Sequence, residues 1–391
     1  MKKKILFVMP SLNSGGAEKS LISVLSLFDY ERYDVDLLLF RHEGLFFDKI
    51  PKMVKLLSPG ENFNLFDGDA ANAVKSFLKN GRFDLAAARI KYGICLKNKD
   101  SYKREKGAWR EIKKSIDYPK ERYDCVIGYL EGLSDWFASD FLGAGKKIGY
   151  MHSYLDRSLA DKKFFGETVK KFDSFVAVSP ECKQNLEKSY PDYKNFCVIE
   201  NITSPKLMPV GDADVLPNDG NVRVLTVGRL SHEKGPDIAV EACRILKEGG
   251  AKIKWYHVGG GPEKDKISQM IKEYGLENYF ILLGEKSDPY PYFYSCDIYV
   301  QPSRHEGKSI AVDEAKCFLK PIVVTDFPSA YDQINDGTDG IICKTNASSV
   351  ADAVKHLAEN EDERLKLKSG LLSQPLGNEE EILKLYELIE K

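Results

Sequence analysis

The chain lacks the features that mark several common classes of protein. Its eight cysteines stand singly, without a C-x-x-C pair or a histidine cluster, which excludes a disulfide scaffold and zinc sites of the usual spacing. We expect reduced cysteines and a cytoplasmic protein. No apolar run reaches the roughly 20 residues of a membrane span, and Pro10 and Gly15-Gly16 cut short the run that follows Lys4. The sequence therefore predicts neither a signal peptide nor an integral membrane protein, but a soluble or peripheral one.

The chain also lacks a strong net charge. Its formal charge is -2 over 391 residues, of which 43% are hydrophobic and 30% charged. A near-neutral sum argues against nucleic acid as the main partner, and the apolar content excludes a disordered chain. This length is too great for one ordinary core, so two domains are expected.

Short apolar runs recur along the chain, each followed by a polar turn and a helical stretch. Strands that alternate with helices form parallel sheets, and two series of them predict two doubly wound α/β domains. The predicted strands are 5–10, 35–40, 125–130, 147–151, 174–178, 197–200, 222–228, 252–259, 279–284, 298–301, 321–326 and 340–344. A linker rich in Pro, Gly and Asp separates the series. We expect a first domain at 1–203 and a second at 204–375, with a last helix at 376–391 that returns to the first.

One local charge patch stands out. Residues 75–122 are dense in Lys and Arg interleaved with aromatic and aliphatic residues, in a region, 60–122, that is expected to form helices inserted between strands of the first sheet. Two interpretations stay open: a solvated basic surface, or a surface that meets anionic lipid headgroups.

Two glutamates lie eight positions apart after the predicted strand 298–301. Glu306 would lie in the loop at the carboxyl end of that strand, and Glu314 on the following helix. Carboxylates accept hydrogen bonds from hydroxyl groups, and backbone amides at a helix start favour a phosphate. The pattern suits a nucleotide sugar.

Further candidates follow other predicted strands. Arg229 and Lys234 lie five apart on the loop after 222–228, where they could hold phosphates, although such residues are often merely solvated. Glycine turns at 259–261 and around Gly284 would share the same rim, as a lining for a nucleotide base or as plain turns. In the first domain, the Gly15-Gly16 turn is either structural or a close approach to a ligand, and His152 follows a strand end, where an imidazole could contact a sugar.

These motifs together resemble the retaining glycosyltransferases of family 4, also called group 1. The resemblance is carried, in order, by 15–18, 227–229 with 233–235, 258–262, and 302–303 with 306–307 and 314–315. It implies a GT-B fold, in which two Rossmann-like domains face each other across a cleft, the first for the acceptor and the second for the nucleotide-sugar donor. The form Glu-Gly-Lys-Ser-Ile at 306–310 resembles enzymes of bacterial capsular and exopolysaccharide biosynthesis.

The resemblance implies a role for each motif. Arg229 and Lys234 would neutralise the diphosphate of the donor, which would stabilise the leaving group. Glu306 would hold hydroxyls of the donor sugar, helped by backbone amides of 307–309, Glu314 would bind the ribose, and His152 would contact the sugar near its reacting end. The residues expected to act in catalysis are Arg229, Lys234, Glu306 and His152. Those expected to bind the donor are Gly15, Gly16, Gly228, Gly260, Gly284, Lys286, Gly307, Lys308, Ser309, Ile310 and Glu314.

The implied reaction moves a sugar from a nucleotide-diphosphate donor, commonly a UDP-sugar, to a glycan or a polyprenyl-diphosphate-linked acceptor. Because side-chain cations take the place of a metal, neither a metal nor another cofactor is expected. The triplets Asp67-Gly68-Asp69 and 212–214 are accordingly interpreted as a helix cap and part of the linker. The family commonly carries an aromatic residue and a glycine at positions 308 and 309, so Lys308 is either a further phosphate contact or solvent-facing.

Two alternatives to a transferase predict different sequence features. One is a non-catalytic nucleotide-sugar-binding subunit that supports a partner transferase. Such a subunit is expected to have lost the phosphate-binding or the carboxylate residues, yet all four are present: Arg229, Lys234, Glu306 and Glu314. A dehydrogenase with a nicotinamide cofactor would carry G-x-G-x-x-G after a strand, and this motif is missing.

Overall fold

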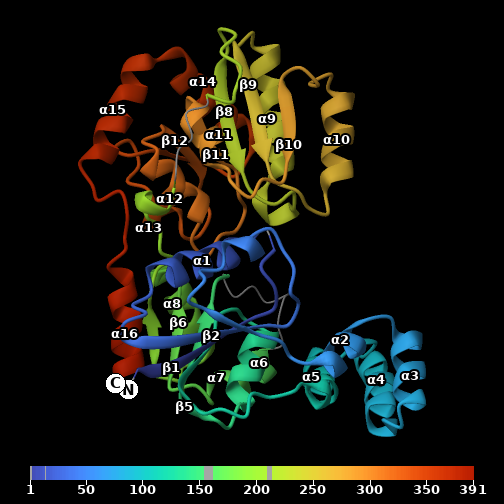
Figure 1. Ribbon diagram of the computed structural model, residues 1–391. Coiled ribbons are helices and arrows are strands. Elements are labelled where there is room, and N and C mark those ends of the chain that lie inside the picture. Colours follow the sequence, from blue (N-terminus) through green and yellow to red (C-terminus); the bar gives the residue numbers. More distant parts are fainter. Residues whose placement is uncertain (1, 14, 154–161, 209–213) are drawn as a thin grey trace. The chain divides into compact units, whose positions relative to one another are not determined.

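The computed structural model describes residues 2–13, 15–153, 162–208 and 214–391. The chain divides into two compact units: Met1–Asn13, Ala17–Ile199 and Ile382–Lys391 form the first, and Ser14–Gly16 with Glu200–Glu381 form the second. Each unit is built on an open parallel sheet covered by helices (Figure 1).

The first unit holds a seven-stranded parallel sheet of order β3-β2-β1-β4-β5-β6-β7 in the described residues. Its strands are β1 (Lys3–Met9), β2 (Tyr33–Leu39), β3 (Lys55–Leu57), β4 (Tyr123–Gly128), β5 (Ala144–Met151), β6 (Ser174–Ala177) and β7 (Phe196–Val198). The inner strand β1 is buried from Ile5 to Met9, which agrees with its continuous apolar run in the sequence.

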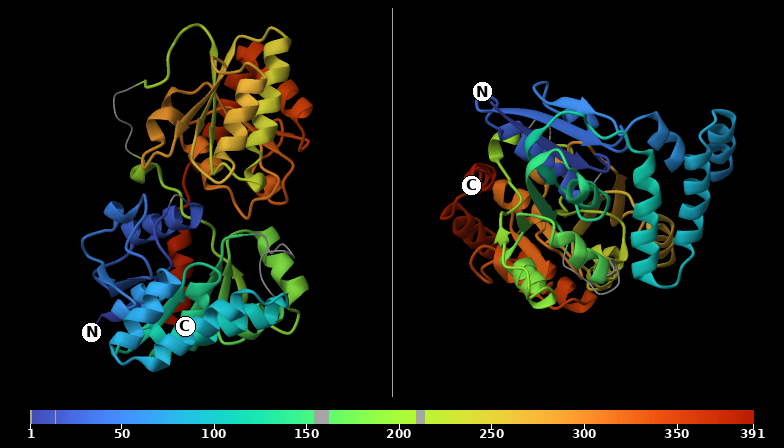
Figure 2. Two further views of the ribbon diagram at one scale, coloured as in Figure 1. Left: turned by 90° about the vertical axis from the view of Figure 1, so that its right-hand side faces the viewer. Right: turned by 90° about the horizontal axis from the view of Figure 1, so that it is seen from below.

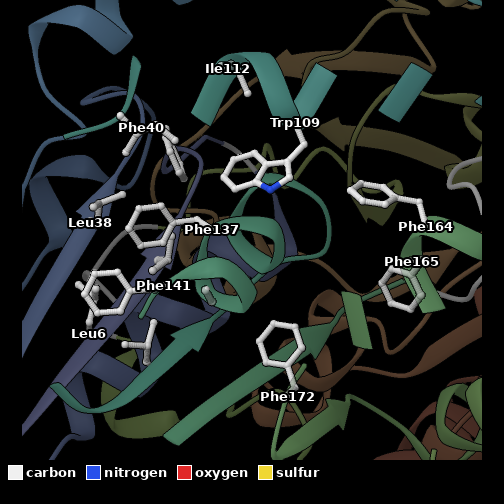
Figure 3. Close-up of a cluster of buried hydrophobic side chains, with 14 of the residues drawn as sticks. Leu6, Leu38, Phe40, Trp109, Ile112, Phe137, Phe141, Phe164, Phe165 and Phe172 are labelled. Atoms are coloured by element: carbon white, nitrogen blue, oxygen red, sulfur yellow. The ribbon is translucent and has the colours of Figure 1, made fainter. Parts of the chain in front are cut away.

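Helices cover this sheet and supply most of its aromatic core. They are α1 (Gly16–Leu27), α2 (Glu61–Asp67), α3 (Ala70–Lys79), α4 (Phe83–Leu96), α5 (Ser101–Ile112), α6 (Leu133–Asp140), α7 (Lys162–Val169) and α8 (Pro180–Ser189). Figure 3 shows Leu6 and Leu38 of the strands beside Phe137 of α6, with Trp109 of α5 nearby. Helix α5 is therefore part of the core, although it belongs to the basic segment.

The last helix, α16 (Glu381–Glu390), packs on the first unit. The Tyr386 ring lies 5.2 Å from that of Tyr33, in a stacked arrangement, and 5.3 Å from that of Phe28. The C-terminal segment thus closes one face of the sheet that the N-terminal strand begins.

As far as its residues are described, the second unit holds a six-stranded parallel sheet of order β10-β9-β8-β11-β12-β13. Its strands are β8 (Val222–Val227), β9 (Ile253–Val258), β10 (Phe280–Gly284), β11 (Ile298–Gln301), β12 (Ile322–Thr325) and β13 (Ile341–Cys343). Its helices are α9 (Pro236–Glu248), α10 (Lys264–Glu273), α11 (Tyr290–Ser295), α12 (Ile310–Cys317), α13 (Ala330–Gln333), α14 (Ala347–Glu359) and α15 (Glu361–Leu372). Two hydrophobic clusters, one containing Trp255 and the other Tyr299, fill the two sides of the sheet.

Helices α2 to α5 form the insertion expected in the region 60–122, between β3 and β4. Figures 1 and 2 show α3 and α4 as its outermost part, away from the sheet of their own unit. None of the helices in the described ranges combines the length and apolarity that crossing a bilayer requires.

All twelve predicted strands are present, and the prediction of two doubly wound parallel sheets is confirmed. Strand β3 was not predicted from the sequence. This strand has only three residues, none of them fully buried, at the sheet edge beside β2, so it carries too little apolar pattern to be recognised.

Candidate functional site

The turns that follow β8, β9 and β10 lie side by side in the second unit. The amide of Gly228 donates to the carbonyl of Val258 (3.0 Å), that of Gly259 to Gly284 (2.9 Å) and that of Leu230 to Gly260 (2.7 Å). The expectation that these glycine turns share the rim of the Arg229–Lys234 loop is confirmed. Lys286 continues the turn after β10, with its ammonium 6.0 Å from the centre of the Tyr292 ring.

Two glycines allow neighbouring loops at this edge of the sheet to approach closely, Gly235 toward the loop after β11 and Gly259 toward the loop after β8. Gly235 is left-handed at φ 63°, and a Cβ there would overlap the carbonyl oxygen of Pro302. Gly259 has φ 145°, and a Cβ there would overlap the carbonyl oxygen of Gly228. Side chains at either position would push neighbouring loops apart.

The loop after β8 is fixed to the loop after β11 by an ion pair. Nζ of Lys234 lies 2.6 Å from Oε2 of Glu306, whose side chain is only 5% exposed, whereas that of Lys234 is 31% exposed. The other carboxylate oxygen of Glu306 accepts from Oγ of Ser303 (2.7 Å) and from Nε2 of Gln301 (3.2 Å). Glu306 therefore orients the ammonium group of Lys234, while about a third of the Lys234 side chain stays accessible to solvent.

Arg304 makes a second connection between the same two loops. Its guanidinium donates to both carboxylate oxygens of Asp237 (2.8 and 2.7 Å) and to the carbonyl of His232 (2.8 Å). Its backbone amide donates to the carbonyl of Glu233 at 2.7 Å. A bidentate arginine fixes geometry more tightly than a lysine can, so the conformation of the 229–235 loop is set from 301–306.

Arg229 itself is exposed on that loop. Burial by itself would raise the pKa of Glu233, but a hydrogen bond from its own backbone and the positive charges of Arg229 and Lys234 lower it. Both cations therefore act on the same small region, as the sequence analysis required of a phosphate site.

Glu314 lies on α12 and is buried, at 2% exposure. Burial and the charges of Glu306 and Glu314 together raise the pKa of Tyr299 well above its ordinary value. Both carboxylates consequently lie near one tyrosine hydroxyl. Of the four residues expected to converge, Lys234 and Glu306 are in contact, and Arg229 and Glu314 belong to the same unit and the same edge of its sheet.

Lys308 corrects one expectation. Its side chain is only 8% exposed, so the solvent-facing alternative is wrong. The ammonium is ion-paired with Glu200 and lies 3.4 Å from Oδ2 of Asp313. Burial alone would lower the pKa of Lys308, but Asp313 and Glu200 outweigh burial and raise it. The lysine thus ties the loop after β11 to the segment where the second unit begins.

Gln333 holds the start of α12. The amide of Ser309 donates to Oε1 of Gln333 (2.8 Å), and Nε2 of Gln333 donates to the carbonyl of Ser309 (2.9 Å) and to Asp313 (3.0 Å). A ligand could take the Ser309 amide only by displacing Gln333. Gly307 and Ile310, on either side, are buried in the same turn.

The residues that hold the expected site residues in place were not predicted from the sequence. These are Gln301, Ser303, Arg304 and Gln333. Gln301 and Ser303 had one available signal, since polar residues at the end of a buried strand lie where α/β proteins bind ligands. Gln333 had none, because it reaches the site from a different turn.

In the first unit, His152 follows β5. Its backbone amide donates to Oε2 of Glu131 (3.0 Å), and Oγ of Ser153 donates to Oε1 of the same carboxylate (2.5 Å). The imidazole stacks on the Tyr150 ring at 5.8 Å. Gly15 and Gly16 lie between β1 and the body of α1. The roles expected for these three residues stay predictions.

The two Asp-x-Asp triplets have ordinary partners where they are described. Asp69 caps α3 by accepting from the amide of Asn72 (2.9 Å), and Asp67 pairs with Arg41 (2.6 Å). Asp214 pairs with Arg223 (2.9 Å), whereas residues 212 and 213 lie outside the described residues. The helix-cap interpretation of Asp69 is confirmed.

Comparison with known proteins finds a family match in this second unit. Residues 212–370 match the family model described as glycosyl transferases group 1. Over 175 residues the chain is 33% identical to the N,N'-diacetylbacillosaminyl-diphospho-undecaprenol alpha-1,3-N-acetylgalactosaminyltransferase of Campylobacter jejuni, which covers 43% of this chain and 45% of the relative. Over 234 residues it is 27% identical to a 4-alpha-N-acetylgalactosaminyltransferase of the same organism, covering 57% and 60%. The chain thus spans about half the length of these relatives.

Solved structures match over the whole chain. Anabaena HepE in complex with UDP and glucose has a TM-score of 0.71 at 18% identity, covering 99% of both chains. A variant of S. aureus TarM in complex with fondaparinux, alpha-GlcNAc-glycerol and UDP has a TM-score of 0.71 at 17% identity, covering 100% of both. These likenesses show the fold, and the expected GT-B architecture is confirmed.

Proposed function

We propose that this chain, a member of the group 1 glycosyl transferases by its second unit, moves a sugar from a nucleotide-diphosphate donor to a glycan or lipid-linked acceptor. A UDP-sugar is the proposed donor, and the acceptor belongs to the biosynthesis of a surface polysaccharide. The chain would act in the cytoplasm, peripherally at the inner face of the cell membrane.

One observation carries this proposal. Lys234, on the loop that also bears Arg229, is ion-paired with the buried carboxylate of Glu306 on the loop after β11. An ammonium oriented by a carboxylate and still partly exposed can receive a phosphate without first being ordered. Glycosidic bond cleavage places new negative charge on the leaving diphosphate, which is where two fixed cations have their largest effect.

The identity of the substrates is supported by the named relatives. The HepE and TarM structures contain UDP, and the two Campylobacter relatives carry names that describe diphospho-undecaprenol acceptors. None of these names describes a non-catalytic subunit, so the alternative of a supporting subunit has no favouring observation.

Retention is proposed without an enzyme-bound sugar. Both oxygens of Glu306 are occupied by Lys234, Ser303 and Gln301, which disfavours this carboxylate as a nucleophile. The acceptor hydroxyl would attack the face that the diphosphate leaves, and the leaving phosphate oxygen would take its proton. Because Arg229 and Lys234 supply positive charge at the diphosphate, we infer that no metal is required.

The test is to measure transfer, or slow donor hydrolysis, in Arg229→Ala and Lys234→Ala. By analogy with the loss of one group that stabilises developing charge, each variant should lose about 10²–10³-fold in kcat. Lys264→Ala, an exposed lysine on α10, should keep normal turnover. Arg229→Ala matters most because its exposed side chain can be removed without unfolding the unit. Near-normal turnover in both variants would contradict the proposal, and UDP binding without any turnover of nucleotide sugars would favour the non-catalytic subunit.

A further inference from the structure

An open groove runs between α3 and α4, in the first unit. Its volume is about 760 Å³, and its apolar lining includes Val74 and Leu78 of α3 and Ile90 and Ile94 of α4. Leu78 is 48% exposed, Ile90 54% and Ile94 65%. Large aliphatic side chains on two adjacent helices thus form one solvent-exposed apolar strip.

This strip is not needed to attach the helices to the fold. The opposite face of α4 is buried through Leu85, Ala86 and Ala88, in the same core cluster as Trp109 of α5. Helix α5 is in turn joined to α7, since Tyr102 donates to Glu167 at 2.8 Å. Helix α4 is therefore apolar on two sides, and in the part of the chain that the structure describes only the side of Leu85, Ala86 and Ala88 is packed into a core cluster.

Basic residues border the groove. Lys75, Arg89 and Lys97 belong to its lining. Arg89 is fixed, because its guanidinium donates to the carbonyl of Gly68 (3.1 Å) and lies over the Phe66 and Tyr92 rings. Lys75 and Lys97 are exposed, so their ammonium groups are the adjustable charges of the rim.

The surrounding sequence makes this a strongly positive region in a chain of net charge -2. Residues 70–99 contain seven Lys and Arg but a single acidic residue, Asp84, which is itself paired with Arg82 at 3.2 Å. Apolar side chains flanked by lysines that outnumber the nearby carboxylates are complementary to an anionic lipid bilayer, which has an apolar interior and negatively charged headgroup phosphates.

We propose that the α3–α4 groove is the surface by which this chain docks on an anionic lipid bilayer. Leu78, Ile90 and Ile94 enter the boundary between headgroups and acyl chains, while Lys75 and Lys97 contact lipid phosphates. This docking surface would place the chain beside a lipid-linked acceptor in the bilayer. In that respect alone the inference rests on the proposed function.

Vesicle co-sedimentation tests the apolar part. The chain should bind vesicles of phosphatidylcholine with phosphatidylglycerol at low salt and not vesicles of phosphatidylcholine alone. Ile90→Ser with Ile94→Ser should weaken binding about tenfold, because two half-exposed aliphatic side chains no longer leave water. The matched control, Leu365→Ser with Leu372→Ser on α15, changes side chains that are 54% and 59% exposed and should bind as the parent does.

The basic part is tested in the same assay. Lys75→Gln and Lys97→Gln should each weaken binding about fivefold, and the loss should shrink as salt is raised. Lys264→Gln and Lys272→Gln, each made singly at an exposed lysine of α10, are the charge-matched controls. Far-UV circular dichroism and donor hydrolysis should be unchanged in all these variants.

Three results would overturn the inference: equal binding to neutral vesicles, unchanged binding in the α3–α4 variants, or an equal loss in the controls. A dimer in solution that the Ile90/Ile94 variant abolishes, without vesicle binding by the parent, would assign the groove to a second copy of the chain. Failure of the transferase proposal looks different, because it would leave vesicle binding intact while Arg229→Ala turned over normally.

Discussion

The cations of two regions of this molecule are organised in opposite ways. Around the turns of the second unit, each cation that defines the geometry has a carboxylate at short range: Lys234 with Glu306, Arg304 with Asp237, and Lys308 with Glu200 and Asp313. On α3 and α4, Lys and Arg outnumber acids seven to one over residues 70–99, and large apolar side chains are exposed between them.

Each region is therefore suited to a different kind of partner. A carboxylate partner lowers the net field but fixes the direction of a cation, which suits a small ligand whose phosphates must lie at one position. Unpaired lysines on flexible stems sum into a field without fixed direction, which suits a surface whose charges are mobile. The sequence shows lysines and arginines in both regions but not which of them have a carboxylate partner.

The largest expected effect comes from breaking a buried pair. Lys308→Met would leave Glu200 and Asp313 facing each other without the ammonium, and removing one partner of a buried ion pair costs about 3–5 kcal/mol of unfolding free energy. Chemical denaturation, followed on the transition of the second unit, should show this loss.

Lys344→Met is the matched control for that measurement. Lys344 also forms an ion pair, with Asp326 at 3.0 Å, but its side chain is 77% exposed. An exposed pair adds little, so no measurable change is expected. Equal effects of the two substitutions would show that the pairs of the second unit do not set its structure, and the contrast with α3 and α4 would then lose its basis.

A smaller effect is expected from the glycine that lets two loops meet. Gly235→Ala places a methyl group against the Pro302 carbonyl, at φ 63°, and should cost about 3 kcal/mol, of which about 1 is left-handed strain. Gly337→Ala, at φ 72° with no neighbour within 4 Å, should cost only the strain. If both substitutions cost the same in thermal unfolding, the loop contact does not orient Lys234.

The sequence predicted the framework better than the contacts within it. Buried strands of a parallel sheet are nearly all apolar, so 298–301 and its companions were recognisable from composition. Glu306 was found because it follows such a strand, yet its bond to Lys234 depends on two loops brought together by Gly235 and Arg304, which no local pattern contains. Lys308 shows the same limit, since its partner Glu200 is 108 positions away.

The smallest of these effects concerns the acid sensitivity of the same turns. His257 is buried, and its Nε2 donates to the carbonyl of Gly228 at 3.0 Å, so the neutral ring supports the turn that precedes Arg229. Burial lowers the pKa of His257 to about 4, against about 6.5 in an unfolded chain. Between these values only the unfolded state binds the proton, so this contribution is complete above pH 6.5 and is lost as the pH falls toward 4.

From pH 7 to pH 5, the second unit should therefore lose about 2 kcal/mol of unfolding free energy through this residue. His257→Gln, which keeps a side-chain N–H donor, should flatten that part of the pH profile, and His356→Gln, at an exposed position of α14, should not. Residues 70–99 contain no histidine, so vesicle binding should be unaffected by the same acidification. A profile that is equally steep in His257→Gln would mean that groups other than this imidazole make the turns sensitive to acid.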